Sequence, residues 1–293
     1  MKRRDIMSSP SENPPPKLLE GNLRSTLMLP LAIFLVGGLV YFGVTKMIST
    51  ERSYKDLVRE LNSKTFGNRW IAAYELSKVL GSKSVPDKDM PWLIANLEEL
   101  YGTSQDSRSR DFLVVAVGSL KKPESVPLLL KALNDSDKNV VFHALVALGN
   151  LPGTVEFSKE VLLPFLAAKD HAHQQAAILA LATHRYPRAN GEIQKLLAEE
   201  AAGIRYAAAT SLINYKNSAA LPVLKEILLL DGAPIKGAVF DANQVRSLKL
   251  NVLYALRNNN WSELNAFLGQ IIINEKNPEV AIKAKEALIL LKK

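Results

Sequence analysis

The sequence predicts an all-α protein: a solenoid of about seven repeated helix pairs, preceded by one transmembrane helix. Three observations support this prediction. A long uncharged stretch lies near the N-terminus, paired helical segments recur after residue 50, and the second segment of each pair has alanine and leucine at fixed spacings. Aromatic residues make up only 7% of the chain, which also favours helices because strands are enriched in aromatic and β-branched side chains.

The uncharged stretch from Ser25 to Thr45 is predicted to cross a membrane. It reads STLMLPLAIFLVGGLVYFGVT, between Arg24 and Lys46. A span needs about 20 apolar residues, whereas a cleaved signal peptide has a shorter apolar core and a small-x-small cleavage site, which is absent here. A buried core helix is the other alternative, but the flanks lack helical periodicity. We expect a transmembrane helix over residues 25–48 and a disordered, basic, Pro/Ser-rich tail over residues 1–24.

The number of basic residues on each side of this helix is equal and does not decide its orientation. The N-terminal tail carries five Lys or Arg residues, and residues 46–65 also carry five. The Met-Lys-Arg-Arg start is typical of a signal anchor and favours a cytoplasmic N-terminus. We therefore expect the solenoid outside the cytoplasm, in the periplasm if the source is a Gram-negative bacterium.

Composition excludes several kinds of chemistry. The chain has no cysteine, which rules out disulfides, thiolate nucleophiles and cysteine-based metal sites. The net charge of +8 is spread along the chain and lacks the clustered basic face of a nucleic-acid-binding protein. Nucleic-acid binding is therefore the least favoured function. The common phosphate-binding and nucleophile motifs are also absent.

The repeat is clearest on the second helix of each pair. These helices align, at spacings of 31 to 41 residues, on one apolar position that we number 0: Leu76, Val117, Leu148, Leu181, Leu212, Leu253 and Leu288. Position −4 is alanine in five repeats, and position −7 is arginine in four. All three positions share one helical face. Alanine there lets neighbouring helices approach closely, and a long arginine can bury its stem while its head reaches a carboxylate or carbonyl.

This arginine–alanine–leucine signature resembles the HEAT repeat, and the short spacings resemble the HEAT-like repeats of the phycobilisome-lyase type. The resemblance covers about residues 54–293 of a solenoid domain expected over 49–293, and Leu113, Lys249 and Ala281 depart from the signature. It implies a right-handed α-solenoid in which stacked neighbours share one continuous core. We expect first helices at about 54–62, 89–101, 124–133, 156–168, 190–199, 218–230 and 261–273.

We expect no enzyme activity, no metal and no cofactor. HEAT-like di-iron hydroxylases use His-Glu pairs, but none of the four histidines is followed by glutamate: His143, His171, His173 and His184. The alternative that remains is an enzyme or accessory subunit of the lyase- or hydroxylase-type HEAT proteins. A cleft lined by convergent polar groups would indicate such an enzyme or accessory subunit.

The second helices also offer a candidate binding surface. Position −2 lies about 160° from the core-facing position, and in HEAT solenoids the second helices usually line the concave side. The candidate residues for partner binding are Tyr74, Phe112, Val115, Phe142, Val146 and Leu179. They predict a site for an apolar or amphipathic peptide segment. The opposing interpretation is that curvature buries these side chains between repeats.

Two further features complete the prediction. Residues 231–243 are the longest interruption of the repeat pattern, and such an insertion either binds a partner or is a tolerated surface loop. Trp70, Trp92 and Trp261 are expected to pack, and polar residues of the last pair to form a solvent-facing cap. The predicted function is a membrane-anchored scaffold or adaptor that binds another protein or a peptide.

Overall fold

The computed structural model describes residues 52–63, 65–82, 85–235 and 238–291. The segment Ser53–Lys293 forms a compact unit of its own. Its described residues are helical apart from turns, loops and one isolated β-bridge between Ile235 and Ala238. The expected tail and transmembrane helix lie outside the described residues. Among those that are described, no helix has the length and apolar character needed to cross a membrane.

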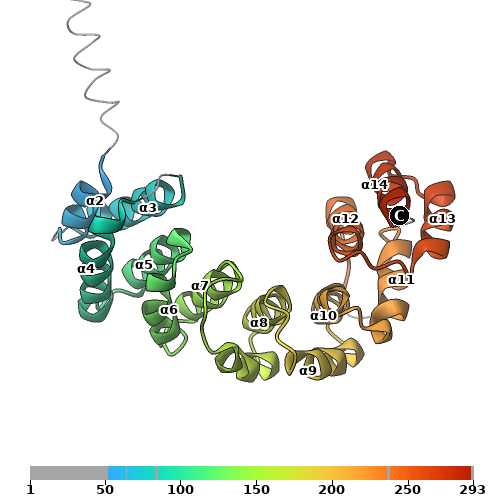
Figure 1. Cartoon of the computed structure of the whole chain (residues 1–293), viewed down its shortest axis with the longest axis horizontal. Coiled ribbons are helices and arrows are strands. Elements are labelled where there is room, and N and C mark those ends of the chain that lie inside the picture. Colours follow the sequence, from blue (N-terminus) through green and yellow to red (C-terminus); the bar gives the residue numbers. More distant parts are fainter. Residues whose placement is uncertain (1–51, 64, 83–84, 236–237, 292–293) are drawn as a thin grey trace, which may run out of the picture. The chain divides into compact units, whose positions relative to one another are not determined.

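The described chain folds into helix pairs that follow one another in a row (Figure 1). First and second helices alternate as α2 (Tyr54–Leu61) and α3 (Phe66–Ser82), α4 (Met90–Thr103) and α5 (Ser107–Leu120), α6 (Val126–Ala132) and α7 (Lys138–Gly149), η3 (Lys159–Ala167) and α8 (His171–Thr183), α9 (Ala189–Lys195) and α10 (Ala202–Leu212), α11 (Leu221–Leu229) and α12 (Ala242–Asn258), and α13 (Asn265–Asn274) and α14 (Pro278–Leu290). Short 3₁₀ turns lie at Asp87–Asp89, Pro123–Ser125, Leu196–Ala198, Ile213–Tyr215 and Ser218–Ala220. The predicted all-helical architecture is confirmed.

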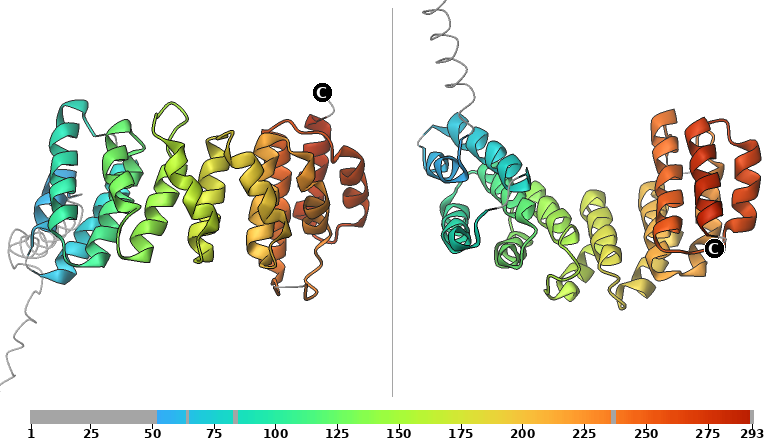
Figure 2. Two further views of the ribbon diagram at one scale, coloured as in Figure 1. Left: turned by 90° about the horizontal axis from the view of Figure 1, so that it is seen from below. Right: turned by 45° about the horizontal axis from the view of Figure 1, so that its top comes forward.

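Within Ser53–Lys293 the second helices stand beside one another on the inner side of the row, and the first helices lie on the outer side (Figures 1 and 2). Contacts join α3 to α5, α5 to α7, α7 to α8 and α8 to α10 in succession. Aspartate side chains start several of these helices. Asp106, Asp137 and Asp170 each accept a hydrogen bond from a backbone N–H in the first turn.

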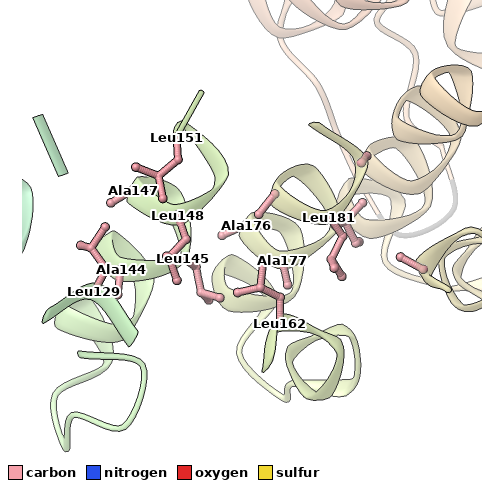
Figure 3. Close-up of a cluster of buried hydrophobic side chains, with 14 of the residues drawn as sticks. Leu129, Ala144, Leu145, Ala147, Leu148, Leu151, Leu162, Ala176, Ala177 and Leu181 are labelled. Carbon is pink, nitrogen blue, oxygen red and sulfur yellow. The ribbon is translucent and has the colours of Figure 1, made fainter. Parts of the chain in front are cut away.

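Positions 0 and −4 form the core that the sequence predicts. At position 0 the residue is buried in the first six repeats, and Leu288 of the last repeat is half-buried. Figure 3 shows the layer between α7 and α8, where Leu145, Leu148 and Ala177 point toward one another and toward Leu162 of η3. This core continues from each pair into the next. A pair therefore buries its apolar side only by stacking on its neighbours.

Small residues bring consecutive second helices close together. Gly118 of α5, at position +1, faces Ala147 of α7, at position −1, and a Cβ added to the glycine would lie 2.6 Å from the Ala147 Cβ. One repeat further, a Cβ on Gly149 would lie 2.8 Å from the Cβ of Ala180. Both distances are too short for two carbon atoms. We call this line of contacts the small-residue seam.

The arginines at position −7 act as the sequence predicts. Nη1 of Arg69, Arg110 and Arg205 donates to the backbone carbonyl of the residue six places earlier, in the loop between the two helices of the pair. Arg110 also forms two hydrogen bonds with Asp135, at 2.7 and 2.8 Å. The adjacent guanidinium holds the pKa of the Asp135 carboxyl well below its usual range.

Three expectations need correction. The fourth first helix is a 3₁₀-helix that contains Pro164, which has no N–H for an α-helical bond. Trp261 packs in the core, but Trp70 and Trp92 are each 38% exposed. Trp70 stacks on Phe112, and Trp92 lies beside Lys55. The last pair is also less polar than expected, since α14 exposes Ile282, Ile289 and Leu290.

Alanine substitutions test the small-residue seam. Gly118→Ala and Gly149→Ala should each lower the free energy of unfolding by about 1–3 kcal/mol, because the added methyl has no room. Gly269→Ala is the control. It lies within α13 with open space around it and should stabilise by up to about 1 kcal/mol. Urea denaturation of the three variants measures these changes in the free energy of unfolding. If all three substitutions stabilised the protein, the claim that the second helices leave no space beside Gly118 and Gly149 would be contradicted.

Candidate partner-binding surface

The six candidate residues lie on four consecutive second helices, α3, α5, α7 and α8. We call this set the apolar stripe: Tyr74, Phe112, Val115, Phe142, Val146 and Leu179. Tyr74 is 44% exposed and Leu179 is 53% exposed. The other four are half-buried, and Phe112, Phe142 and Val146 pack partly against the core. Stacking therefore covers the middle of the stripe in part and leaves its two ends open.

Two residues that the sequence reasoning missed extend the stripe at its first repeat. Trp70 and Ile71 precede Tyr74 by about one helical turn, and both are exposed. The Trp70 ring stacks on Phe112 of the next repeat, with 6.1 Å between the ring centroids. Residues three or four places apart share a helical face. The i, i+4 spacing of Trp70 and Tyr74 was therefore a signal available in the sequence.

A cation orients the aromatic ring at the open end of the stripe. The Lys78 ammonium lies 4.5 Å from the centroid of the Tyr74 ring, in a cation–π contact on the same helix. The Tyr74 side chain remains exposed, so a partner can still reach the ring.

A polar pair borders the middle of the stripe. The Asp111 carboxylate on α5 lies 2.5 Å from Nδ1 of His143 on α7, and both side chains are partly exposed. The hydrogen bond from His143 to Asp111 raises the pKa of the imidazole, and partial burial opposes this rise. His143 also lies edge-on to the Phe142 ring, at 5.2 Å. The pair thus joins two repeats beside the half-buried phenylalanines.

The stripe is confined to the first four repeats. At position −2 the later repeats carry Thr210, Asn251 and Glu286, which are polar. Position −2 of the described solenoid therefore changes from apolar to polar along its length. A ligand with an apolar segment would be held at the N-terminal half of this surface.

The other histidines have structural roles or no close partner that suggests chemistry. Nε2 of His173 lies 2.7 Å from the Lys138 carbonyl oxygen, and Nε2 of His184 lies 2.8 Å from the Leu148 carbonyl oxygen. Both contacts join α8 to α7. Within the described ranges, no group of three or more His, Asp or Glu side chains is placed to hold a metal ion.

Comparison with known proteins identifies the repeat. The family model for HEAT repeats matches residues 90–169 and 159–242, which together span just over half of the chain. A comparison with curated protein sequences gives no match.

Solved structures share this fold, and two of them match this chain over most of its length. The complex of CpcE and CpcF of phycocyanin lyase from Nostoc sp. PCC7120 contains a chain that is 18% identical to this one, with a TM-score of 0.54, over 82% of this chain and 95% of that chain. The YibA protein of Escherichia coli is 15% identical, with a TM-score of 0.53, over 93% of this chain and 89% of that chain. At these identities the likeness concerns the fold alone.

The Asp111–His143 pair should make stability depend on pH. The pKa of His143 is higher in the folded state than its value of 6.5 in the unfolded chain. The pair therefore contributes its full share to the free energy of unfolding at a pH below 6.5, and this contribution is lost as the pH rises through the folded-state pKa. The loss should be less than about 1 kcal/mol, because solvent screens the partly exposed pair. Denaturant unfolding across this pH range measures it.

Asp111→Asn should remove this pH-dependent part of the free energy of unfolding. Asp56→Asn, which alters an exposed aspartate on α2, should keep it. An unchanged profile in Asp111→Asn would rule out the pair as its source.

Proposed function

Because the chain belongs to the HEAT-repeat family, we propose that it is a membrane-anchored scaffold or adaptor that holds a partner protein on its solenoid. The single observation that carries this proposal is the apolar stripe with its open ends at Tyr74 and Leu179. Large apolar side chains grouped on one surface are typical of protein-binding sites. A solenoid offers such a surface on a rigid frame.

The dimensions of the stripe suit an amphipathic helix. It spans four neighbouring helices, and packed helices lie about 8–10 Å apart. The stripe is therefore about 25–30 Å long, which equals about 16–20 residues of α-helix at ~1.5 Å per residue. The apolar face of such a helix would lie along the stripe, and its polar face would remain in water.

The membrane anchor is the second part of the proposal. Residues 25–45 would form the transmembrane helix, with the solenoid outside the cytoplasm. This rests on the uncharged stretch and on the basic N-terminal start. Tethering confines both partners to a surface and raises their effective concentration, so that weak binding is sufficient.

A non-enzymatic role is favoured over the lyase- or hydroxylase-type alternative. The Asp111–His143 pair is the feature that would favour an enzyme, because an imidazole beside a carboxylate can transfer a proton. It borders a stripe of apolar side chains rather than a set of convergent polar groups. The spread-out positive charge gives no support to nucleic-acid binding.

Site-specific photo-cross-linking in membranes tests the proposal. A photoreactive amino acid at position 74 or 179 of the full-length chain should capture the same protein. The same group at position 282, where Ile282 of α14 is 57% exposed, is the control and should not capture it. The full-length chain should fractionate with membranes, and deletion of residues 25–45 should release it and reduce the cross-links.

Equal capture from position 282 would show that the stripe is not the binding surface. Membrane association that survives the deletion would show that the anchor lies elsewhere.

A further inference from the structure

The sixth repeat departs from the pattern in two ways, and the fold brings both departures into one place. An insertion, residues 231–241, separates α11 from α12, and Lys249 stands at position −4, where most repeats have alanine. A cleft of about 580 Å³ is lined by Lys249, by the loop between α13 and α14, and by Asp231, Gly232, Phe240 and Asp241 of the insertion. Sites for drug-sized ligands usually measure about 300–1,000 Å³.

Apolar side chains form the walls of this cleft. Phe240, at the end of the insertion, stacks on Tyr206 of α10 with 5.7 Å between ring centroids, so this wall is fixed to the preceding repeat. Val245 and Ile271 are buried in the facing wall. Leu229, the last residue of α11, lines the cleft and is 63% exposed. A cleft of this kind removes an apolar side chain of a ligand from water.

Six charged residues line the cleft, three of them basic and three acidic: Arg246, Lys249, Lys276, Asp231, Asp241 and Glu275. Nζ of Lys249 lies 2.6 Å from Glu275, and both side chains are 8% exposed. The second carboxylate oxygen of Glu275 accepts a hydrogen bond from the Asn277 N–H at 2.8 Å. Nη1 of Arg246 donates to Glu279 at 3.1 Å. The lining as a whole carries no net charge, so it has little electrostatic attraction for a ligand of net charge.

One donor in the cleft is unsatisfied. The Nε atom of Arg246 is shielded from solvent and has no hydrogen-bond partner among the described residues. Arg246 is one of the residues that line the cleft. A buried donor without a partner is costly, so an added acceptor is favourable. A neutral acceptor beside an apolar group is the chemistry of a peptide carbonyl next to an apolar side chain.

We propose that this cleft binds an uncharged, extended peptide segment of a partner protein, with an apolar side chain between Leu229, Phe240 and Ile271 and a backbone carbonyl that accepts a hydrogen bond from Arg246. The inference rests on the proposed scaffold function and adds a second contact surface to it. The apolar stripe holds one part of the partner, and the cleft in the sixth repeat holds another.

Methyl NMR of the full-length chain in lipid nanodiscs tests this inference with three probes. These are N-acetyl-Leu-Leu-amide, the same dipeptide with a free carboxylate, and N-acetyl-Gly-Gly-amide. The neutral dileucine probe should shift the methyl signals of Leu229, Val245 and Ile271 and leave those of Leu179 unchanged. The free carboxylate and the diglycine should each bind more weakly.

Variants separate a binding role of Arg246 from a structural one. Arg246→Met should lower the affinity for the neutral dileucine probe by about tenfold, because one hydrogen bond from a charged donor is lost. Arg246→Gln should keep most of the binding, since glutamine retains a donor and already occupies position −7 in the fourth repeat as Gln174. Leu179→Glu, which alters only the stripe, should have no effect.

Three outcomes would overturn the inference. The neutral dileucine probe could leave the methyl signals of the cleft unshifted, the probe with the free carboxylate could bind more tightly than the neutral one, or Arg246→Met could bind the neutral probe as well as the unsubstituted protein does. In each case the cross-links from positions 74 and 179 would still decide the proposed function on their own. Conversely, if the probe bound the cleft but positions 74 and 179 gave no cross-links, the cleft would be supported as a binding site and the binding role of the apolar stripe would be contradicted.

Discussion

The second helices α5, α7 and α8 meet where a glycine of one helix faces an alanine of the next. Gly118 against Ala147 and Gly149 against Ala180 leave no space for even one added carbon atom. This distance places other positions opposite each other as well. Position −6 of one repeat meets position −5 of the next, as in the Trp70–Phe112 stack and the Asp111–His143 pair. The close packing of successive second helices thus forms both the core and the apolar stripe.

The cleft forms where the insertion and a buried charged pair interrupt the repeat pattern. Between α10 and α12 the contacts are much sparser than between α8 and α10. Phe240 of the insertion packs on Tyr206 of α10, and the buried Lys249–Glu275 pair stands where other repeats have alanine. A charged pair and a loop take more room than a methyl group. The cleft lies beside them, lined by α11, α12 and the loop between α13 and α14.

The sequence predicted the features that depend on one helix at a time. The spacing of Leu148 and its equivalents gave the helix pairs, and the role of Arg110 followed from its length and its place at the start of a helix. Features that depend on the angle between repeats could not be predicted in this way. The exposure of Trp70 is one example, and the pairing of Lys249 with Glu275, 26 residues later, is another. The binding role of the stripe is still a prediction.

Hydrogen exchange of a Leu148→Ala variant, read helix by helix, tests the central claim most directly. Leu148 is fully buried in the layer between α7 and α8. The substitution should cost about 2–5 kcal/mol. If each pair buries its apolar side only against its neighbours, protection should fall in α5, α7 and α8 and stay unchanged in α14. An equal loss of protection in every helix would show one central core and would contradict the account.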